Sequence, residues 1–254
     1  VLRRANGFYT YFAADIAYHR NKLDVRGFDL AINIWGADHH GHVARLQAAL
    51  DGLGLDGSHR LVIVLMQLVN LLQDGKPVRM SKRTGKAIAL HDLLDEISVD
   101  AARYYFNNRA ATSPLDFDLD LAVRQDSDNP VYYVQYAHAR ICSLIARMKE
   151  AGAGVCPARE VDACALAQPE ELALVKTIAQ YPEEIRLAAR DYDPSRINRY
   201  LTTLAGDFHR FYNACRCMVD DSRVQAARLK LADSVRLVLA NGLSLLGVCA
   251  PNKM

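Results

Sequence analysis

Residues 30–50 read LAINIWGADHHGHVARLQAAL, and this stretch decides the fold class of the first half of the chain. Residues 30–35 form an apolar run typical of a buried strand, and the run ends in Gly36. Residues 40–50 carry helix formers with apolar positions on one helical face. A second apolar run at 60–69, RLVIVLMQLV, predicts another strand. Strand, helix and strand at this spacing predict a parallel α/β unit, whose functional site lies where the strands end.

The second half of the sequence has a different pattern, that of long amphipathic helices. A side chain able to cap a helix precedes proline at 129–130 and at 193–194, and Pro169 is followed by two glutamates, as at a helix start. Apolar residues recur at helical spacing over 131–148, 197–218 and 231–245. The first of these apolar stripes is interrupted by His138. These stripes predict a helical bundle.

Length and composition favour a two-domain globular protein. With 254 residues the chain exceeds the usual size of one domain, and we expect an α/β domain over 1–128 and an all-α domain over 129–254. The net charge is only +2, so composition alone does not indicate a nucleic-acid binder. No apolar run reaches the length of a membrane span, and the first residues do not resemble a signal peptide. The six cysteines include no CxxC pair and are expected to be reduced thiols of a cytoplasmic protein.

A cationic loop follows the second apolar run. The segment 78–87 reads VRMSKRTGKA, and from Gly75 to His91 there are five basic residues, two glycines and no carboxylate. Ammonium groups neutralise phosphate charge, and glycines allow the backbone to approach a phosphate closely. Lys82 is the candidate for binding the phosphates in the transition state of a transfer from a nucleoside triphosphate. Considered alone, the loop is more readily interpreted as a solvated run of charges between a strand and a helix.

Four separated segments resemble arginyl-tRNA synthetases, which are class I aminoacyl-tRNA synthetases. VRMSKR at 78–83 resembles the KMSKS signature, with Arg79 in place of its first lysine. The other segments are YTYFAADIAYH at 9–19, WGADHHGHVARLQAAL at 35–50 and LDFDLDLAVRQDSDNPVYYVQYAHARI at 115–141. The resemblance covers nearly the whole chain. It implies part of a Rossmann-like nucleotide-binding domain followed by an α-helical anticodon-binding bundle.

Matching the motifs residue by residue implies a site for ATP and arginine. Lys82 would be catalytic, and the ATP contacts would be Gly36, His39, Met80, Ser81 and Lys82. The arginine contacts would be Tyr11, Asp15 and Asp38. Tyr11 and Asp15 are four residues apart and share one helix face, and a carboxylate suits the planar guanidinium fork. The alternative for Asp15 is a surface acid that pairs with Arg20 or Lys22.

The same resemblance implies that the bundle binds the tRNA anticodon. Aromatic rings stack on unpaired bases, and arginines bind phosphates. The positions implied are Tyr136, Arg140, Tyr212, Asn213 and Met254. Each competes with a packing role, and Tyr136 does so most strongly.

The cluster Asp38-His39-His40-Gly41-His42 raises a different possibility, a metal-dependent hydrolase. Adjacent histidines at a helix start point about 100° apart, and the sequence contains no HExxH motif. We therefore assign no metal ligand.

A HIGH-type signature, which class I enzymes carry early in the nucleotide fold, does not occur in these residues. We expect the chain to be the C-terminal portion of a longer synthetase that joins L-arginine to its tRNA through arginyl-adenylate. ATP with Mg²⁺ would be consumed, and this fragment alone would be inactive. The expected protein is a cytoplasmic monomer that binds tRNA, L-arginine and ATP and no membrane. The competing hypothesis is a non-catalytic RNA-binding module that uses only the bundle.

Overall fold

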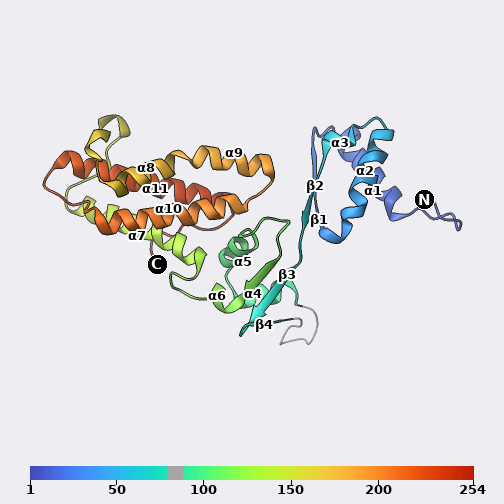
Figure 1. Ribbon diagram of the computed structural model, residues 1–254, viewed down its shortest axis with the longest axis horizontal. Helices are drawn as coiled ribbons and strands as arrows, with labels where there is room; N and C mark the ends of the chain where they lie inside the picture. Colours follow the sequence, from blue (N-terminus) through green and yellow to red (C-terminus); the bar gives the residue numbers. More distant parts are fainter. Residues whose placement is uncertain (79–87) are drawn as a thin grey trace. The chain divides into compact units, whose positions relative to one another are not determined.

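The computed structural model describes residues 1–78 and 88–254. The chain divides into two compact units, Val1–Val69 with Ala111–Leu115 and Asn70–Ala110 with Asp116–Met254. Figure 1 labels their elements. The first unit contains α1 (Tyr11–Arg20), η1 (Asn21–Val25), β1 (Ala31–Gly36), η2 (Ala37–His39), α2 (His40–Gly52), α3 (Gly57–Arg60) and β2 (Leu61–Met66). The remaining elements are β3 (Val69–Gln73), β4 (Lys76–Pro77), α4 (Leu90–Glu96), α5 (Val99–Phe106), β5 (Leu115–Asp118), α6 (Leu119–Ala122), α7 (Pro130–Glu150), η3 (Ala158–Glu160), η4 (Ala163–Ala165), α8 (Pro169–Ala179), α9 (Tyr181–Asp191), α10 (Ser195–Ala214) and α11 (Ser222–Leu245).

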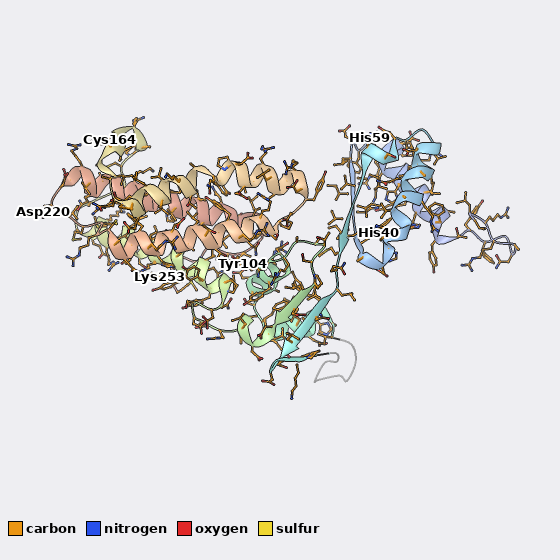
Figure 2. All side chains as sticks on the ribbon, in the orientation of Figure 1. His40, His59, Tyr104, Cys164, Asp220 and Lys253 are labelled. Carbon is orange, nitrogen blue, oxygen red and sulfur yellow. The ribbon has the colours of Figure 1, made fainter. Side chains whose placement is uncertain are left out.

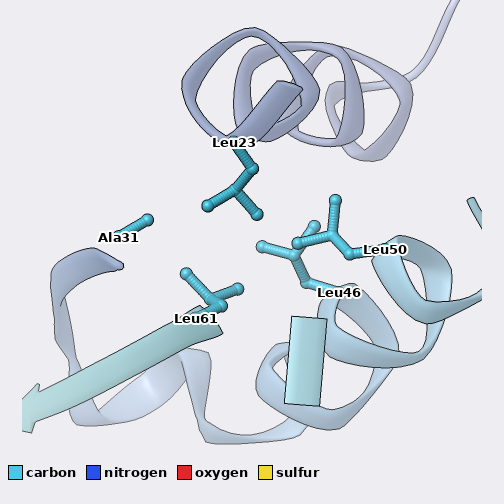
Figure 3. Packing of buried hydrophobic residues seen from close by; sticks show 5 residues of the cluster. All are labelled: Leu23, Ala31, Leu46, Leu50 and Leu61. Atoms are coloured by element: carbon cyan, nitrogen blue, oxygen red, sulfur yellow. The ribbon is translucent and has the colours of Figure 1, made fainter. Parts of the chain in front are cut away.

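The core of the first unit is the predicted strand–helix–strand motif. β1 and β2 pair in parallel, in a register that runs from Ala31 opposite Leu61 to Gly36 opposite Met66. α2 connects the strands, and its apolar side chains pack against one face of the pair. Figure 3 shows the buried cluster, which consists of Leu23, Ala31, Leu46, Leu50 and Leu61. The parallel α/β prediction for this segment is confirmed.

The predicted strand over 60–69 is too long. β2 ends at Met66, and the Gln67 amide then donates a hydrogen bond to the Ala111 carbonyl at 2.8 Å. Leu68 is 84% exposed, and β3 begins at Val69 in a different sheet, of order β4–β3–β5. The apolar run at 60–69 therefore contains all of β2 and the first residue of β3, which belong to different sheets.

The second unit is dominated by the helical bundle, in which α10 packs against α7, α8, α9 and α11. The predicted cap of α7 is present, because the Asn129 side chain accepts a hydrogen bond from the Val131 amide at 3.3 Å. At α10 the helix begins one residue later than predicted, with Pro194 as the N-cap, although Asp193 still accepts a hydrogen bond from the Ser195 amide at 3.1 Å. Gly242 on α11 allows a close approach, since a Cβ there would lie 2.6 Å from a methyl group of Leu201. The predicted bundle is confirmed.

One predicted stripe extends past its helix. α10 ends at Ala214, and Cys215 adopts an extended conformation that stops the helical repeat. Met218, placed at the end of the stripe by its spacing, is 58% exposed. The helical period of a sequence pattern does not show where the backbone leaves the helix.

Two polar groups in the core of the second unit are tied to the backbone. His138, which interrupts the stripe of α7, is buried and donates from Nδ1 to the Pro251 carbonyl at 2.9 Å. Tyr104 on α5, labelled in Figure 2, lies against α10, and its hydroxyl donates to the Asn198 carbonyl at 3.3 Å. Burial raises the pKa of Tyr104 to about 12. The histidine is therefore a hydrogen-bonded core residue.

The predicted combination of an α/β part with an all-α bundle is confirmed. The boundary between 128 and 129 stays a prediction. Within residues 1–78 and 88–254, no helix is long and apolar enough to cross a bilayer.

Candidate functional site

A cleft of about 870 Å³ opens in the first unit, where β1 gives way to α2 beside the start of α1. Its walls come from residues 10–15, 35–39 and 41–45, together with Val1 and Arg4. Its position fits the expectation for a parallel α/β unit, because functional side chains gather where the strands end.

Four of the predicted contacts for arginine and ATP line this cleft, namely Tyr11, Asp15, Asp38 and His39. They come from two segments of the chain, so the fold brings them together. Tyr11 is 87% exposed, and its large apolar surface is open to a ligand. The Asp38 carboxylate is also exposed and lies 3.8 Å from His39 Nε2.

Gly36 lies at the end of β1, next to this cleft. A Cβ at this position would be 2.5 Å from Asp38 Oδ1, so any larger residue would displace the carboxylate. The displaced group is the exposed end of a side chain, so this shift would cost little. Gly36 itself does not line the cleft, and its predicted ATP contact stays a prediction.

Asp15 has a partner that the sequence did not reveal. Its Oδ2 lies 3.1 Å from Nε2 of His42 on α2. The alternative of a surface pair with Arg20 or Lys22 is wrong, because Arg20 pairs with Asp24 at 3.3 Å and Lys22 donates to Asn33 at 3.2 Å. Asp15 is therefore held by the wall of the cleft.

The predicted residues of the cationic loop, Met80, Ser81 and Lys82, lie outside the described residues. Their roles stay predictions. No group of three or more histidine, cysteine or acidic side chains in the described ranges is arranged to hold a metal ion.

A second candidate site, on the bundle, brings three of the predicted tRNA contacts together. We call it the aromatic–arginine face, and it consists of Tyr132, Tyr136, Arg140, His209 and Tyr212. The Arg140 guanidinium carbon lies 4.0 Å from the centre of the Tyr212 ring and 5.8 Å from that of Tyr136. Arg147 donates to the Tyr212 hydroxyl at 2.9 Å. Arginine beside tyrosine rings is an arrangement that suits both phosphates and unpaired bases.

The other two predicted tRNA contacts lie differently. Asn213 is exposed near the end of α10. Met254 is 52% exposed and lines a cavity of about 430 Å³ with Tyr132. Because the Tyr132 and Tyr136 rings are parallel with centres 6.2 Å apart, Tyr132 connects this cavity to the aromatic–arginine face.

His209 is a partly buried member of the aromatic–arginine face. Its ring centre is 4.9 Å from that of Tyr133 and 5.9 Å from that of Tyr136. Arg140 approaches His209 Nδ1 at 3.4 Å, and the buried Nε2 has no hydrogen-bond partner among the described residues. Burial, reinforced by the charge of Arg140, lowers the pKa of His209 to about 4. The imidazole is therefore neutral at physiological pH.

This depressed pKa predicts a loss of stability in acid. Between the usual pKa of 6.5 and the folded value of about 4, the unfolded chain binds a proton at His209 that the folded chain does not. Stability is unaffected by this group above that window and falls as the pH is lowered through it. We expect a loss of about 2 kcal/mol between pH 7.5 and pH 5, measured by urea denaturation. Burial also lowers the pKa of His138, which adds to the loss.

The control is His209→Phe, which keeps an aromatic ring but has no titratable group. Its stability should fall less between the two pH values than that of the wild type, and the difference is the His209 contribution. An unchanged pH dependence in this variant would contradict the assignment.

Sequence reasoning missed several residues of both sites. His42, Phe12, Trp35 and Arg45 line the cleft without having been assigned a role. His209 was likewise not nominated on the bundle. Two signals were available: the cluster at 38–42 includes His42, and Arg45 lies three residues after His42 on the same helix face. The pairing of His42 with Asp15 joins residues 27 positions apart and depends on the packing of α1 against α2.

Comparison with known proteins gives a consistent result. Residues 134–254 match the DALR anticodon binding domain. Over all 254 residues the chain is 55% identical to an arginine–tRNA ligase of Moorella thermoacetica and 54% identical to one of Carboxydothermus hydrogenoformans. The chain spans 45% of the length of these two curated relatives.

Solved structures agree. A putative arginyl-tRNA synthetase from Campylobacter jejuni is 37% identical, with a TM-score of 0.85, and the match covers 100% of this chain and 54% of that one. The arginyl-tRNA synthetase of Thermus thermophilus, at 23% identity and a TM-score of 0.84, supports the fold; the match covers 100% of this chain and 51% of that one. Since the similarity extends over the whole of this sequence and its helical half matches the DALR anticodon binding domain, the chain is similar to one part of the arginyl-tRNA synthetases.

Proposed function

We propose that this chain is the part of an arginine–tRNA ligase that holds the arginine pocket, one portion of the ATP site and the anticodon-binding bundle. The observation that carries the proposal is the gathering of Tyr11, Asp15, Asp38 and His39 around one cleft in a chain whose relatives are arginine–tRNA ligases. Residues 1–128 would form the catalytic part and residues 129–254 the anticodon-binding domain.

The proposed reaction has two steps. The carboxylate of arginine attacks the α-phosphorus of ATP, which gives arginyl-adenylate and pyrophosphate. A terminal ribose hydroxyl of the tRNA then attacks the arginyl carbonyl, and AMP leaves. Magnesium would enter with ATP as part of the substrate.

Within this scheme Asp15 would bind the guanidinium group and Tyr11 would lie beside it. Carboxylate and guanidinium form two parallel charge-assisted hydrogen bonds, which an ammonium group cannot reproduce. Asp38 would add a polar contact to arginine or ribose, and Gly36 and His39 would contact the adenosine. Met80 and Ser81 would contact adenine, and Lys82 would stabilise the charge that develops on pyrophosphate.

On the bundle, the aromatic–arginine face would read the anticodon loop. Tyr136 and Tyr212 would stack on unpaired bases, while Arg140 would bind a phosphate. Asn213 and Met254 complete the proposed contacts. The protein is proposed to act as a cytoplasmic monomer.

The competing proposal is a non-catalytic RNA-binding module, favoured by the lack of a HIGH-type signature in these residues. A titration of chain 1–254 with an arginine-accepting tRNA and, separately, with L-arginine and ATP distinguishes the two. The ligase proposal expects binding of all three, whereas a tRNA binder that ignores arginine and ATP would favour the module. We also propose that chain 1–254 alone is inactive, and arginine-dependent ATP–pyrophosphate exchange by it would contradict this.

Variants of the aromatic–arginine face should weaken tRNA binding. Loss of one stacked ring in Tyr212→Ala is expected to reduce affinity by about tenfold. Arg140→Ala should reduce it by a similar factor and lower the slope of log affinity against log salt by about one. Filter binding at several salt concentrations measures both effects.

Arg186→Ala is the matched control for these variants. Arg186 is an exposed arginine on α9 that is paired with Glu183 at 2.7 Å and lies outside the face. The affinity of the Arg186→Ala variant for tRNA should stay near that of the wild type. Equal losses in Arg140→Ala and Arg186→Ala would indicate general electrostatic attraction and would contradict a specific face.

A further inference from the structure

His42 is fixed in the wall of the cleft on every side that the structure describes. Its ring lies between two aromatic groups, with centres 5.3 Å from Phe12 on α1 and 5.4 Å from Trp35 on β1. Arg45 NH2 lies 3.2 Å from His42 Nδ1, and Asp15 Oδ2 lies 3.1 Å from Nε2. The side chain is 19% exposed, so both nitrogens have protein partners in a partly dry setting.

These partners determine the tautomer of the ring. A guanidinium group can only donate hydrogen bonds, so Nδ1 must accept from Arg45 and carries no proton. The ring hydrogen of the neutral imidazole is then on Nε2, where it is donated to Asp15. Arg45 and His42 therefore form a directed chain of hydrogen bonds that ends on the carboxylate.

This chain of hydrogen bonds leaves Asp15 free to bind a cation. The side chain of Asp15 is 43% exposed, so a ligand in the cleft can reach it. Within residues 1–78 and 88–254, its second oxygen, Oδ1, has no hydrogen-bond partner. A carboxylate anchored through one oxygen keeps a fixed plane, whereas an unanchored one rotates freely about its terminal bond. A fixed plane matters for a planar fork of donors and much less for a compact ammonium group.

We propose that His42 is the positioning residue of the guanidinium site: by donating from Nε2 to Asp15 Oδ2 it holds the carboxylate in the plane that accepts a guanidinium fork. Arg45 acts one step further out by fixing the tautomer of His42. The proposal rests on the proposed function, because it takes the ligand to be the guanidinium group of arginine. It adds to that function a residue that sets selectivity for guanidinium over ammonium.

The test compares the affinities of chain 1–254 for L-arginine and L-lysine by NMR titration. His42→Phe keeps an aromatic ring against Phe12 and Trp35 but removes the donor. We expect its arginine affinity to fall about three- to tenfold, the equivalent of one hydrogen bond, with a much smaller change for lysine. His42→Gln, whose amide can donate to Asp15, should restore arginine affinity to within about twofold.

The matched control is His40→Phe. His40 is exposed at the first position of α2, is labelled in Figure 2 and does not line the cleft. This variant should bind arginine as the wild type does. Melting temperatures of all variants identify any general loss of folding, which would lower the affinities for arginine and lysine together.

A spectroscopic measurement detects the hydrogen bond between His42 and Asp15 independently of ligand affinity. Ring ¹⁵N shifts, assigned by the signal missing in His42→Phe, should show His42 protonated on Nε2 alone, and Asp15→Ala should shift the Nε2 signal. If wild type binds arginine and His42→Phe binds it equally well, the positioning role is overturned while the arginine site stands. If wild type does not bind arginine, the proposed function fails instead, and the ring shifts still report whether the pair exists.

Discussion

Replacement of Asp15 by alanine is expected to weaken L-arginine binding to chain 1–254 by about 100-fold or more. The carboxylate would supply both acceptors for the guanidinium fork, and hydrogen bonds to charged groups contribute about 1.5–3 kcal/mol each. Loss of two such bonds corresponds to at least two orders of magnitude in affinity. NMR or calorimetric titration with arginine measures the effect.

Asp24→Ala is the control for this substitution. Asp24 is also an acid in the first unit, 50% exposed and paired with Arg20, but it does not line the cleft. It should leave arginine affinity unchanged. Equal affinity in Asp15→Ala and the wild type would rule out Asp15 as the guanidinium acceptor.

The largest effect on stability is expected for Glu171→Ala in the bundle. Glu171 is fully buried at the start of α8, and its Oε1 accepts from Arg228 Nε on α11 at 2.5 Å. Its Oε2 accepts from the amides of Ala167 and Gln168, both at 2.8 Å. Removal of the carboxylate leaves a largely buried guanidinium and two amides without their acceptor. Breaking a buried pair in this way costs about 3–5 kcal/mol, which urea denaturation should detect.

A surface pair of the same chemistry provides the comparison. Glu183 pairs with Arg186 at 2.7 Å, but both side chains are more than half exposed. Glu183→Ala should change stability by no more than about 1 kcal/mol. Similar losses of stability in the two variants would show that burial does not determine how much the Glu171–Arg228 pair stabilises the fold.

The elements with strong periodicity could be predicted from the sequence. α7 follows from an apolar stripe and a cap, α11 follows from its stripe alone, and β1 with α2 follows from an apolar run, a glycine and a change of period. The split between β2 and β3 could not be predicted, because Gln67 and Leu68 lie in an apolar run and the break depends on which strand each half pairs with. Local pattern carries no information about the partner of a strand.

The residues of the candidate sites could likewise be predicted only in part. Tyr11, Asp15, Asp38 and His39 were identified through family motifs, and the fold gathers them in one cleft. The His42 and Asp15 pair was missed, since it depends on two helices packing across a gap of 27 residues. On the bundle, Tyr136 and Arg140 are one turn apart on α7, whereas Tyr212 joins them only through the packing of α10.

The chain contains a single tryptophan, and Trp35 lies in the cleft with its ring centre 6.1 Å from His39 and 5.4 Å from His42. Light absorbed selectively by indole therefore excites one site in the whole chain. Because the emission of an indole depends on its immediate surroundings, a ligand that enters the cleft beside Trp35 should change it. Ligand entry can thus be followed optically in the unmodified protein, with no attached dye.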